Sequence, residues 1–291
     1  MRKRYLLIIN PNAGQSRIIE EDIVRHFSKR GLKLDVCETR KPKDATRIAR
    51  KAVGKYDVVM AAGGDGTVNE VINGLAGSET ELGIIPAGTE NVLSKELKIP
   101  QNHLDAAKKV IRNNGKLFDL GKAKNRYFIM MAGVGLDAKA SRNVEIRPAL
   151  KKMMGRLAYP LVGLETYLKD KPSRLKIWLD DQRLPRCGYY AVIGNIKQYG
   201  GNIKITPKAN PKDGYLDITI FKSKDVFSML KYFIGAKWKD KIVELPSIEY
   251  FRVKKIKIQS KDKVYAHTDA EIIGTTPVNI EVVPKAIRII C

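Results

Sequence analysis

Residues 1–115 alternate between short apolar runs and amphipathic segments, and this alternation is the strongest constraint on the fold. Apolar runs at 4–10, 56–62 and 81–89 are typical of buried strands, whereas 16–31 and 43–55 repeat their apolar residues with helical spacing. Strands that alternate with helices form βαβ units, which build a parallel sheet. The sequence therefore predicts an α/β domain with a parallel sheet.

After residue 117 the pattern changes to short strands separated by polar turns. Runs at 174–186, 187–195 and 249–261 alternate apolar and polar residues, as in half-buried strands. This predicts a second domain built as an antiparallel β-sandwich. We expect domains at 1–117 and 118–291, and leave open whether the last residues return to the first domain.

Composition excludes several classes of protein. No apolar run approaches the roughly 18 residues of a membrane-spanning helix, and the basic, apolar start lacks the features of a signal peptide. The three cysteines and three histidines are scattered along the chain, which disfavours a disulfide framework, a zinc site and a Ser-His-Asp triad. These observations predict a cytoplasmic protein.

The net charge of +23 predicts attraction to a polyanion. No basic tail or base-reading helix is visible, so we expect no nucleic acid partner. The stretch 142–170 combines basic and apolar residues and suits an anionic membrane surface. A helix packed on the sandwich, with its lysines in water, is an equally acceptable interpretation of the same stretch, and a solvated basic surface with no dedicated partner stays open.

Three glycine-bearing loops follow predicted strands of the first domain: Asn10-Pro11-Asn12-Ala13-Gly14, Gly63-Gly64-Asp65-Gly66-Thr67 and Pro86-Ala87-Gly88-Thr89-Glu90-Asn91. Loops at the carboxyl ends of parallel strands share one edge of the sheet, where helix N-termini favour an anion. Ordinary turns are the alternative for any single loop. Because the lysine of a P-loop is missing, a bound polyphosphate would need a metal held by carboxylates.

The segments NPNAG, GGDGTVNEVINGL and PAGTENVLSKEL, in this order, resemble the diacylglycerol kinase catalytic superfamily. More closely, the chain is similar to bacterial soluble lipid kinases of the YegS/DgkB/BmrU type. The resemblance continues through FDLGKAKNRYFIMMAGVGLDA to HTDAEIIGTTPVNIEVVPKA and covers nearly the whole chain. It implies an α/β nucleotide-binding domain followed by a β-rich domain, with ATP between them.

The resemblance also implies roles for individual residues. Asp65 and Asp119 match carboxylates of a magnesium and water network, and Asp269 matches the general base, with Glu271 as the second carboxylate of its motif. On an alternating strand Asp269 and Glu271 would share one face, and a turn aspartate on a hairpin is the alternative for Asp269. Ala270 stands where the family has glycine. The residues that match ATP contacts are Asn10, Pro11, Asn12, Ala13, Gly14, Thr39, Gly63, Gly64, Asp65, Gly66, Thr67 and Thr89.

Asn210, Asp213 and Tyr215 match a structural magnesium loop in the family, although a plain hairpin turn is the alternative. The resemblance therefore implies an ATP- and Mg²⁺-dependent lipid kinase that acts most plausibly on diacylglycerol. It would bind peripherally at the inner face of the membrane. An NAD kinase-like enzyme, a non-catalytic nucleotide or lipid sensor, and a homodimer stay open.

Overall fold

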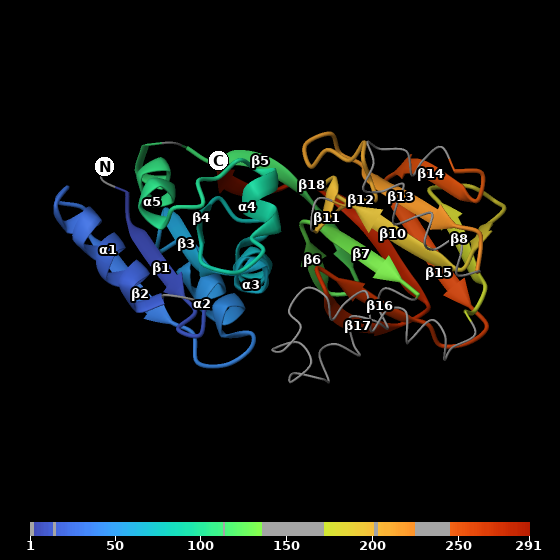
Figure 1. Cartoon of the computed structure of the whole chain (residues 1–291), viewed down its shortest axis with the longest axis horizontal. Coiled ribbons are helices and arrows are strands. Elements are labelled where there is room, and N and C mark those ends of the chain that lie inside the picture. The colour runs from blue at the N-terminus through green and yellow to red at the C-terminus, as the bar shows by residue number, and fades with distance from the viewer. Residues whose placement is uncertain (1–2, 14–15, 113, 136–171, 201–202, 225–244) are drawn as a thin grey trace. The chain divides into compact units, whose positions relative to one another are not determined.

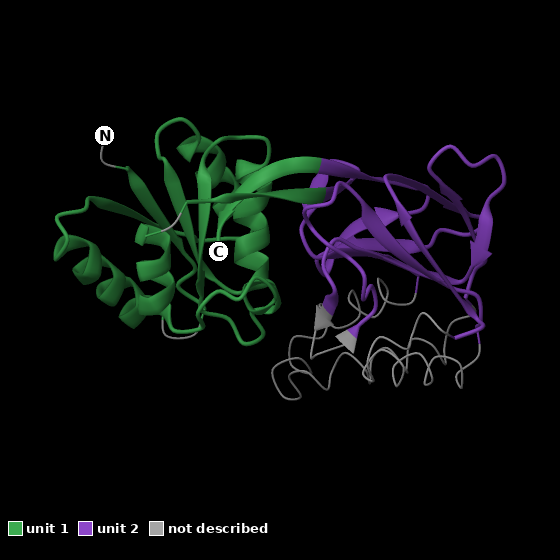
Figure 2. Cartoon of the chain, turned by 90° about the horizontal axis from the view of Figure 1, so that it is seen from above, with its two compact units in different colours: residues 1–120, 284–291 green, residues 121–283 purple. Residues whose placement is uncertain are grey.

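A computed structural model of the chain describes residues 3–13, 16–112, 114–135, 172–200, 203–224 and 245–291 (Figure 1). The chain forms two compact units, residues 1–120 with 284–291 and residues 121–283 (Figure 2). Strands β5 (Lys116–Ala123) and β18 (Val278–Ile290) each contribute residues to both units.

The first unit is built around a parallel sheet. Its strands lie in the order β2-β1-β3-β4, and the last residues of β18 pair in parallel with β4. All six residues of β3 are buried, as expected for a central strand covered on both faces. The elements are β1 (Tyr5–Ile9), α1 (Ser16–Ser28), β2 (Leu34–Glu38), α2 (Asp44–Ala52), β3 (Val58–Gly63), α3 (Asp65–Leu75), β4 (Glu81–Pro86), α4 (Val92–Glu96) and α5 (His103–Arg112).

The order of the strands explains where the helices pack. The chain runs outward from β1 to β2 and then back across β1 to β3, so right-handed crossovers place α1 on one face and α2 on the other. In agreement, α2 packs against α3 and α1 packs against α5.

The second unit consists of antiparallel strands. One sheet has the order β14-β13-β10-β7-β16-β17, and β18, β15, β8 and β9 form the other. The alternating residues of both sheets enclose a core of buried aliphatic side chains, including Ile177, Ile218 and Ile258. The strands are β6 (Arg126–Phe128), β7 (Met131–Val134), β8 (Leu175–Leu179), β9 (Arg186–Gly188), β10 (Tyr190–Gly194), β11 (Gln198–Gly200), β12 (Ile203–Lys204), β13 (Leu216–Phe221), β14 (Ile248–Val253), β15 (Lys255–Ser260), β16 (Tyr265–Thr268) and β17 (Glu271–Thr275).

The architecture confirms the predicted fold class, an α/β domain with a largely parallel sheet followed by an antiparallel β-rich domain. Cys37, Cys187 and Cys291 are free thiols. Among the described helices, none is long and apolar enough to cross a membrane. Gly14 and the basic stretch 142–170 lie outside the described residues.

Candidate active site

The loops expected to bind a nucleotide lie at one edge of the parallel sheet in the first unit. β1, β3 and β4 are neighbours, with Ile9 beside Ala62 and Gly63 beside Pro86 at their carboxyl ends. The loop after β2 joins them, because the Thr39 N–H donates to the Ile9 carbonyl at 2.9 Å. The loops that follow these four strands therefore share the edge at which ligands of open α/β sheets bind.

Close contacts within and between these loops require glycine at two positions. A Cβ at Gly63 would lie 2.5 Å from the Thr67 hydroxyl oxygen, and a Cβ at Gly88 would lie 2.5 Å from the Cα of Gly64. Both distances are too short for real atoms. Gly66 differs, because a Cβ there would meet no atom within 4 Å. No contact in the described part of the chain therefore explains the glycine at position 66.

Two asparagine side chains hold the loops in place. Asn10 Nδ2 donates to Thr67 Oγ1 at 3.4 Å, which joins the loops after β1 and β3. Asn91, at φ 50°, accepts from the Gly88 N–H at 3.0 Å and donates to the Gly88 carbonyl at 2.9 Å. The site residues expected from the sequence do not include Asn91, although an asparagine shortly after a loop glycine is a signal for a side-chain-to-backbone turn.

Asp65 opens α3, and its carboxylate binds the beginning of α4. Oδ2 accepts from the Val92 N–H at 3.0 Å, and Oδ1 accepts from the Leu93 N–H at 3.1 Å. A carboxylate at a helix N-terminus satisfies N–H groups that lack partners within the helix. Asp65 therefore fixes the loop after β4 against α3. Each oxygen keeps a lone pair, so these contacts leave room for the magnesium role that the resemblance implies.

Asp119 and Thr89 lie in different surroundings within the first unit. Asp119 on β5 is 2% exposed, and its Oδ1 accepts from the Lys285 N–H at 2.7 Å, which ties β5 to β18. Thr89 is exposed in the loop after β4. Asp119 thus has a structural contact of its own, whereas Thr89 shares the loop edge with Thr67.

Asp269 is a buried carboxylate in the turn between β16 and β17 of the second unit. Oδ1 accepts from the N–H groups of Met130 and Met131 at 3.1 and 2.8 Å, and Oδ2 accepts from the N–H of Ile129 at 3.0 Å. Burial raises the pKa of Asp269 to about 6, although the three N–H groups act to lower it. Asp269 therefore takes up a proton much closer to neutral pH than an ordinary aspartate.

The turn around Asp269 has an unusual backbone. Asp269 and Ala270 both have positive φ, at 45° and 67°. Two consecutive left-handed residues are typical of a tight hairpin turn, in which glycine is favoured at the second position. The Ala270 N–H donates to His267 Nδ1 at 3.3 Å. Ala270 therefore adopts a left-handed conformation that glycine would also adopt.

Glu271 begins β17, and its carboxylate forms an ion pair with Arg126 at 2.6 Å. The sequence predicts that Asp269 and Glu271 share one face of a strand. Asp269 instead lies in the turn, so strand alternation does not relate the two side chains. The two residues are neighbours, but each carboxylate has its own partners.

The 210–215 loop, expected to hold magnesium, is closed by contacts within the chain. Asp213 Oδ1 accepts from the Tyr215 N–H at 3.0 Å, and Asp213 Oδ2 pairs with Arg252 at 2.7 Å. The Asn210 carbonyl accepts from the N–H of Lys212 at 2.8 Å. Within the described residues, no three His, Cys, Asp or Glu side chains cluster as metal ligands. In this arrangement the Asp213 carboxylate is neutralised by Arg252, and magnesium binding by the loop stays a prediction.

Two family profiles match the chain and together span most of it. The diacylglycerol kinase catalytic domain matches residues 4–123, and the YegS C-terminal NAD kinase beta sandwich-like domain matches residues 130–291. The division into a nucleotide-binding domain and a β-sandwich domain thus defines the class as a two-domain kinase fold. The chain belongs to the diacylglycerol kinase family.

Individual relatives agree with this assignment. A diacylglycerol kinase from Staphylococcus aureus (strain bovine RF122 / ET3-1) is 32% identical over 284 residues, which cover 96% of this chain and 89% of the relative. A crystal structure of a diacylglycerol kinase from Bacillus anthracis str. Sterne has a TM-score of 0.77 and 28% identity, covering 99% of this chain and 96% of that one. The predicted class of enzyme, a lipid kinase, is confirmed at the level of the family.

Proposed function

We propose that this protein transfers the γ-phosphoryl group of ATP to the hydroxyl of diacylglycerol, which gives phosphatidic acid. The observation that carries the proposal is the Asp269 carboxylate, buried in the β-rich unit of a diacylglycerol kinase family member, with its pKa raised to about 6. A lipid hydroxyl is a weak nucleophile, and a positioned carboxylate can accept its proton during transfer. The N–H groups of Ile129, Met130 and Met131 hold the Asp269 carboxylate in a fixed position, as a general base requires.

ATP would bind in the first unit, on the loops that follow β1 to β4. Backbone N–H groups and helix N-termini at this edge favour phosphate, and Thr67 and Thr89 offer hydroxyl donors. The open space beside Gly66 supports this proposal, because no atom within 4 Å excludes a side chain there. A glycine at such a position allows a phosphate oxygen to approach the backbone.

Magnesium would be bound together with the nucleotide, where it would neutralise the charge of the phosphates. Asp65 is the candidate ligand in the first unit, since its oxygens keep lone pairs beside the two N–H groups that they accept. The Asp213 loop is not proposed as a second metal site, because Arg252 already neutralises its carboxylate.

Diacylglycerol stays in a membrane, so the enzyme would associate with the membrane surface from the cytoplasmic side. The net charge of +23 supports association with anionic lipids. A homodimer stays an open alternative. Light scattering of the purified protein would resolve it by measuring the molar mass in solution.

The Asp269→Asn variant tests the proposal. Asparagine keeps the size of the side chain but cannot accept the proton, so phosphoryl transfer should fall by about a hundredfold or more. Wild type and variant are incubated with radiolabelled ATP and a lipid panel that includes diacylglycerol, a sphingoid base and phosphatidylglycerol. Thermal unfolding checks that the variant is folded. Full activity in a folded Asp269→Asn protein would overturn the role of Asp269.

Two other functions are separated by the same assay. A non-catalytic sensor is motivated by Ala270 in the base motif, but the φ of 67° there shows that alanine keeps the left-handed turn. ATP binding without turnover of any lipid would favour the sensor. Phosphorylation of NAD in place of lipid would favour an NAD kinase-like enzyme.

A further inference from the structure

The outer face of one sheet in the second unit is basic. Strand β15 alternates, so that Ile256 and Ile258 enter the core while Lys255 and Lys257 are exposed. Lys257 pairs in register with Trp178 on β8 and with Asn279 on β18. Three neighbouring strands therefore present a lysine, an indole and an amide side by side.

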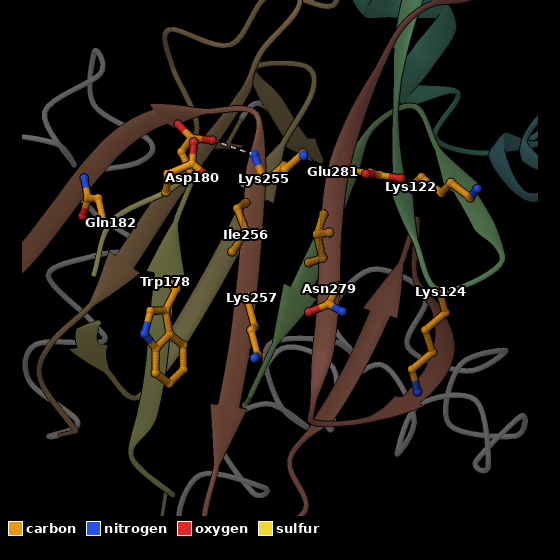
Figure 3. A pocket seen from close by; sticks show the side chains of 12 residues that line it. Lys122, Lys124, Trp178, Asp180, Gln182, Lys255, Ile256, Lys257, Asn279 and Glu281 are labelled. Carbon is orange, nitrogen blue, oxygen red and sulfur yellow. Dashed lines mark hydrogen bonds between the residues drawn. The ribbon is translucent and has the colours of Figure 1, made fainter. Parts of the chain in front are cut away.

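This face is hollowed into a trough that encloses about 750 Å³. Figure 3 shows the side chains that line it, which come from β5, β8, β15, β18 and the turns beside them. The four lysines of the lining are Lys122, Lys124, Lys255 and Lys257. We call this surface the lysine trough.

The charges of the lysine trough are unevenly distributed. The lining also contains three acidic residues, Asp180, Asp181 and Glu281. In Figure 3, Asp180 and Glu281 lie toward one end, whereas Lys124, Lys257 and Asn279 lie toward the other. Asp180 is engaged as a turn residue, since its Oδ1 accepts from the Lys255 N–H at 2.8 Å. The end formed by Lys124, Trp178, Lys257 and Asn279 (Figure 3) therefore offers cationic and amide donors away from these carboxylates.

The ammonium groups at this end are available to a ligand. Within the described residues, neither Lys124 nor Lys257 forms an ion pair. Lys257 Nζ lies 5.8 Å from the Trp178 ring centroid, and Lys124 Nζ donates to the Thr275 carbonyl at a long 3.4 Å. Weakly held ammonium groups beside an amide N–H donor form a site for a phosphate.

We propose that the lysine trough binds the phosphate headgroup of an anionic phospholipid at the membrane surface. The lysines favour an anionic ligand. Trp178 favours a membrane over a free phosphate, because indole side chains prefer the depth of the lipid headgroups. This inference rests on the proposed function, since a diacylglycerol kinase must work at a bilayer. The surface lies on the sheet formed by β8, β15 and β18, whereas Asp269 follows β16 of the other sheet.

Vesicle binding tests the proposal. The full chain is mixed with vesicles of phosphatidylcholine alone or of phosphatidylcholine with about one third phosphatidylglycerol, an anionic lipid. Bound protein is measured by sedimentation. A Lys124→Glu/Lys257→Glu variant should bind the anionic vesicles at least about tenfold more weakly than wild type. The matched control is Lys33→Glu/Lys55→Glu, which makes the same charge change at exposed positions of the first unit and should bind nearly as wild type does.

A second readout follows the indole directly. In a Trp238→Phe background Trp178 is the only tryptophan of the chain, and its fluorescence should shift to shorter wavelength with anionic vesicles. Equal binding of wild type and the trough variant, or equal loss in the control variant, would overturn the proposal. So would a trough that responds to inorganic phosphate or nucleic acid but not to vesicles. Phosphorylation of a short-chain diacylglycerol in detergent micelles separates the two proposals: no turnover by wild type refutes the proposed function, whereas turnover without vesicle binding refutes only the lysine trough.

Discussion

The loops of the first unit and the turn of the second unit are built in opposite ways. In the loops, glycine allows two backbone segments to come close, as where Gly88 meets Gly64. In the turn, the charged side chain of Asp269 is buried and accepts hydrogen bonds from three backbone N–H groups. A site that receives an anion needs open N–H groups, whereas a site that receives a proton needs a carboxylate shielded from water.

The two regions also differ in where backbone strain lies. At the loops, glycines allow the close contacts, and the left-handed conformation of Asn91 falls on a residue type that tolerates it. In the turn, Asp269 and Ala270 adopt positive φ without being glycine, at a cost of roughly 1 kcal/mol for each residue. Hydrogen bonds to Asp269 and the Ala270 N–H bond to His267 offset this cost. The first region therefore depends on residue type, and the second depends on partners.

Alanine at Gly88 should produce the largest effect. Its Cβ would meet the Cα of Gly64 at 2.5 Å, so the two loops must move apart. We expect the free energy of unfolding to fall by about 1–3 kcal/mol, with a large loss of ATP affinity. Urea unfolding and calorimetric titration with ATP measure the two effects.

Gly66→Ala is the matched comparison, because its Cβ enters open space. Because Gly66 lies in the first turn of α3, the substitution should leave the unfolding free energy unchanged or raise it by up to about 1 kcal/mol, and still weaken ATP binding. If Gly66→Ala binds ATP as wild type does, the open space beside it is not where a phosphate lies.

The pH dependence should separate the second region from the first. With a pKa of about 6, Asp269 is a base only above that pH, so kcat should fall about tenfold per pH unit below it. The folded pKa lies above that of the unfolded chain, so the group contributes most to stability at low pH. This contribution should be lost as pH rises from about 4 to about 6.

The Asp269→Asn variant is the control, because it removes the titrating group. Its unfolding free energy, measured against wild type from pH 4 to 7, should lack the component lost over this range. ATP binding, which we propose for the first unit, should have the same pH dependence in wild type and variant, because the terminal phosphate of ATP itself titrates near pH 6. An identical pH profile of unfolding for both proteins would assign the stability transition to another group.

The two regions also differ in how far the sequence predicted them. That the glycine-bearing loops lie together followed from the predicted parallel sheet, since the carboxyl ends of neighbouring strands share an edge. The left-handed turn at Asp269 did not follow in the same way, because the alternating pattern of 263–271 favours a continuous strand and a hairpin turn was only the alternative. Only pairing in three dimensions shows which N–H groups reach its carboxylate.

Ion pairs were the other unpredictable feature. Arg126 meets Glu271, and Arg252 meets Asp213, across strands that are distant in sequence. A motif identifies the acidic residue but not the cation that the fold brings to it. The same holds for the lysine trough, whose members lie on separate strands.

The third prediction concerns whether Arg252 or a magnesium ion neutralises the Asp213 carboxylate. Because Arg252 pairs with this carboxylate and lies 4.4 Å from the Tyr215 ring centroid, chelation of magnesium by EDTA should leave the melting temperature unchanged. Arg252→Gln should lower the unfolding free energy by about 1 kcal/mol, since the pair is partly exposed. Lys222→Gln breaks a pair of similar exposure with Glu249 and is the control. It should cost less, because Arg252→Gln also removes the contact with the Tyr215 ring. A marked fall in melting temperature with EDTA, measured without nucleotide, would contradict this prediction.

The smallest effect is expected from glycine at position 270. Ala270→Gly relieves the left-handed strain at φ 67° but adds freedom to the unfolded chain, so the unfolding free energy should rise by only about 0.5 kcal/mol. Ala76, at φ −51° after α3, provides the comparison, because Ala76→Gly adds the same freedom without relieving strain. It should therefore lower the unfolding free energy by about 0.5 kcal/mol. Chemical denaturation of the two variants decides the sign. If both variants lose stability equally, the turn that carries Asp269 is not strained, and its hydrogen bonds hold a conformation that alanine adopts without cost.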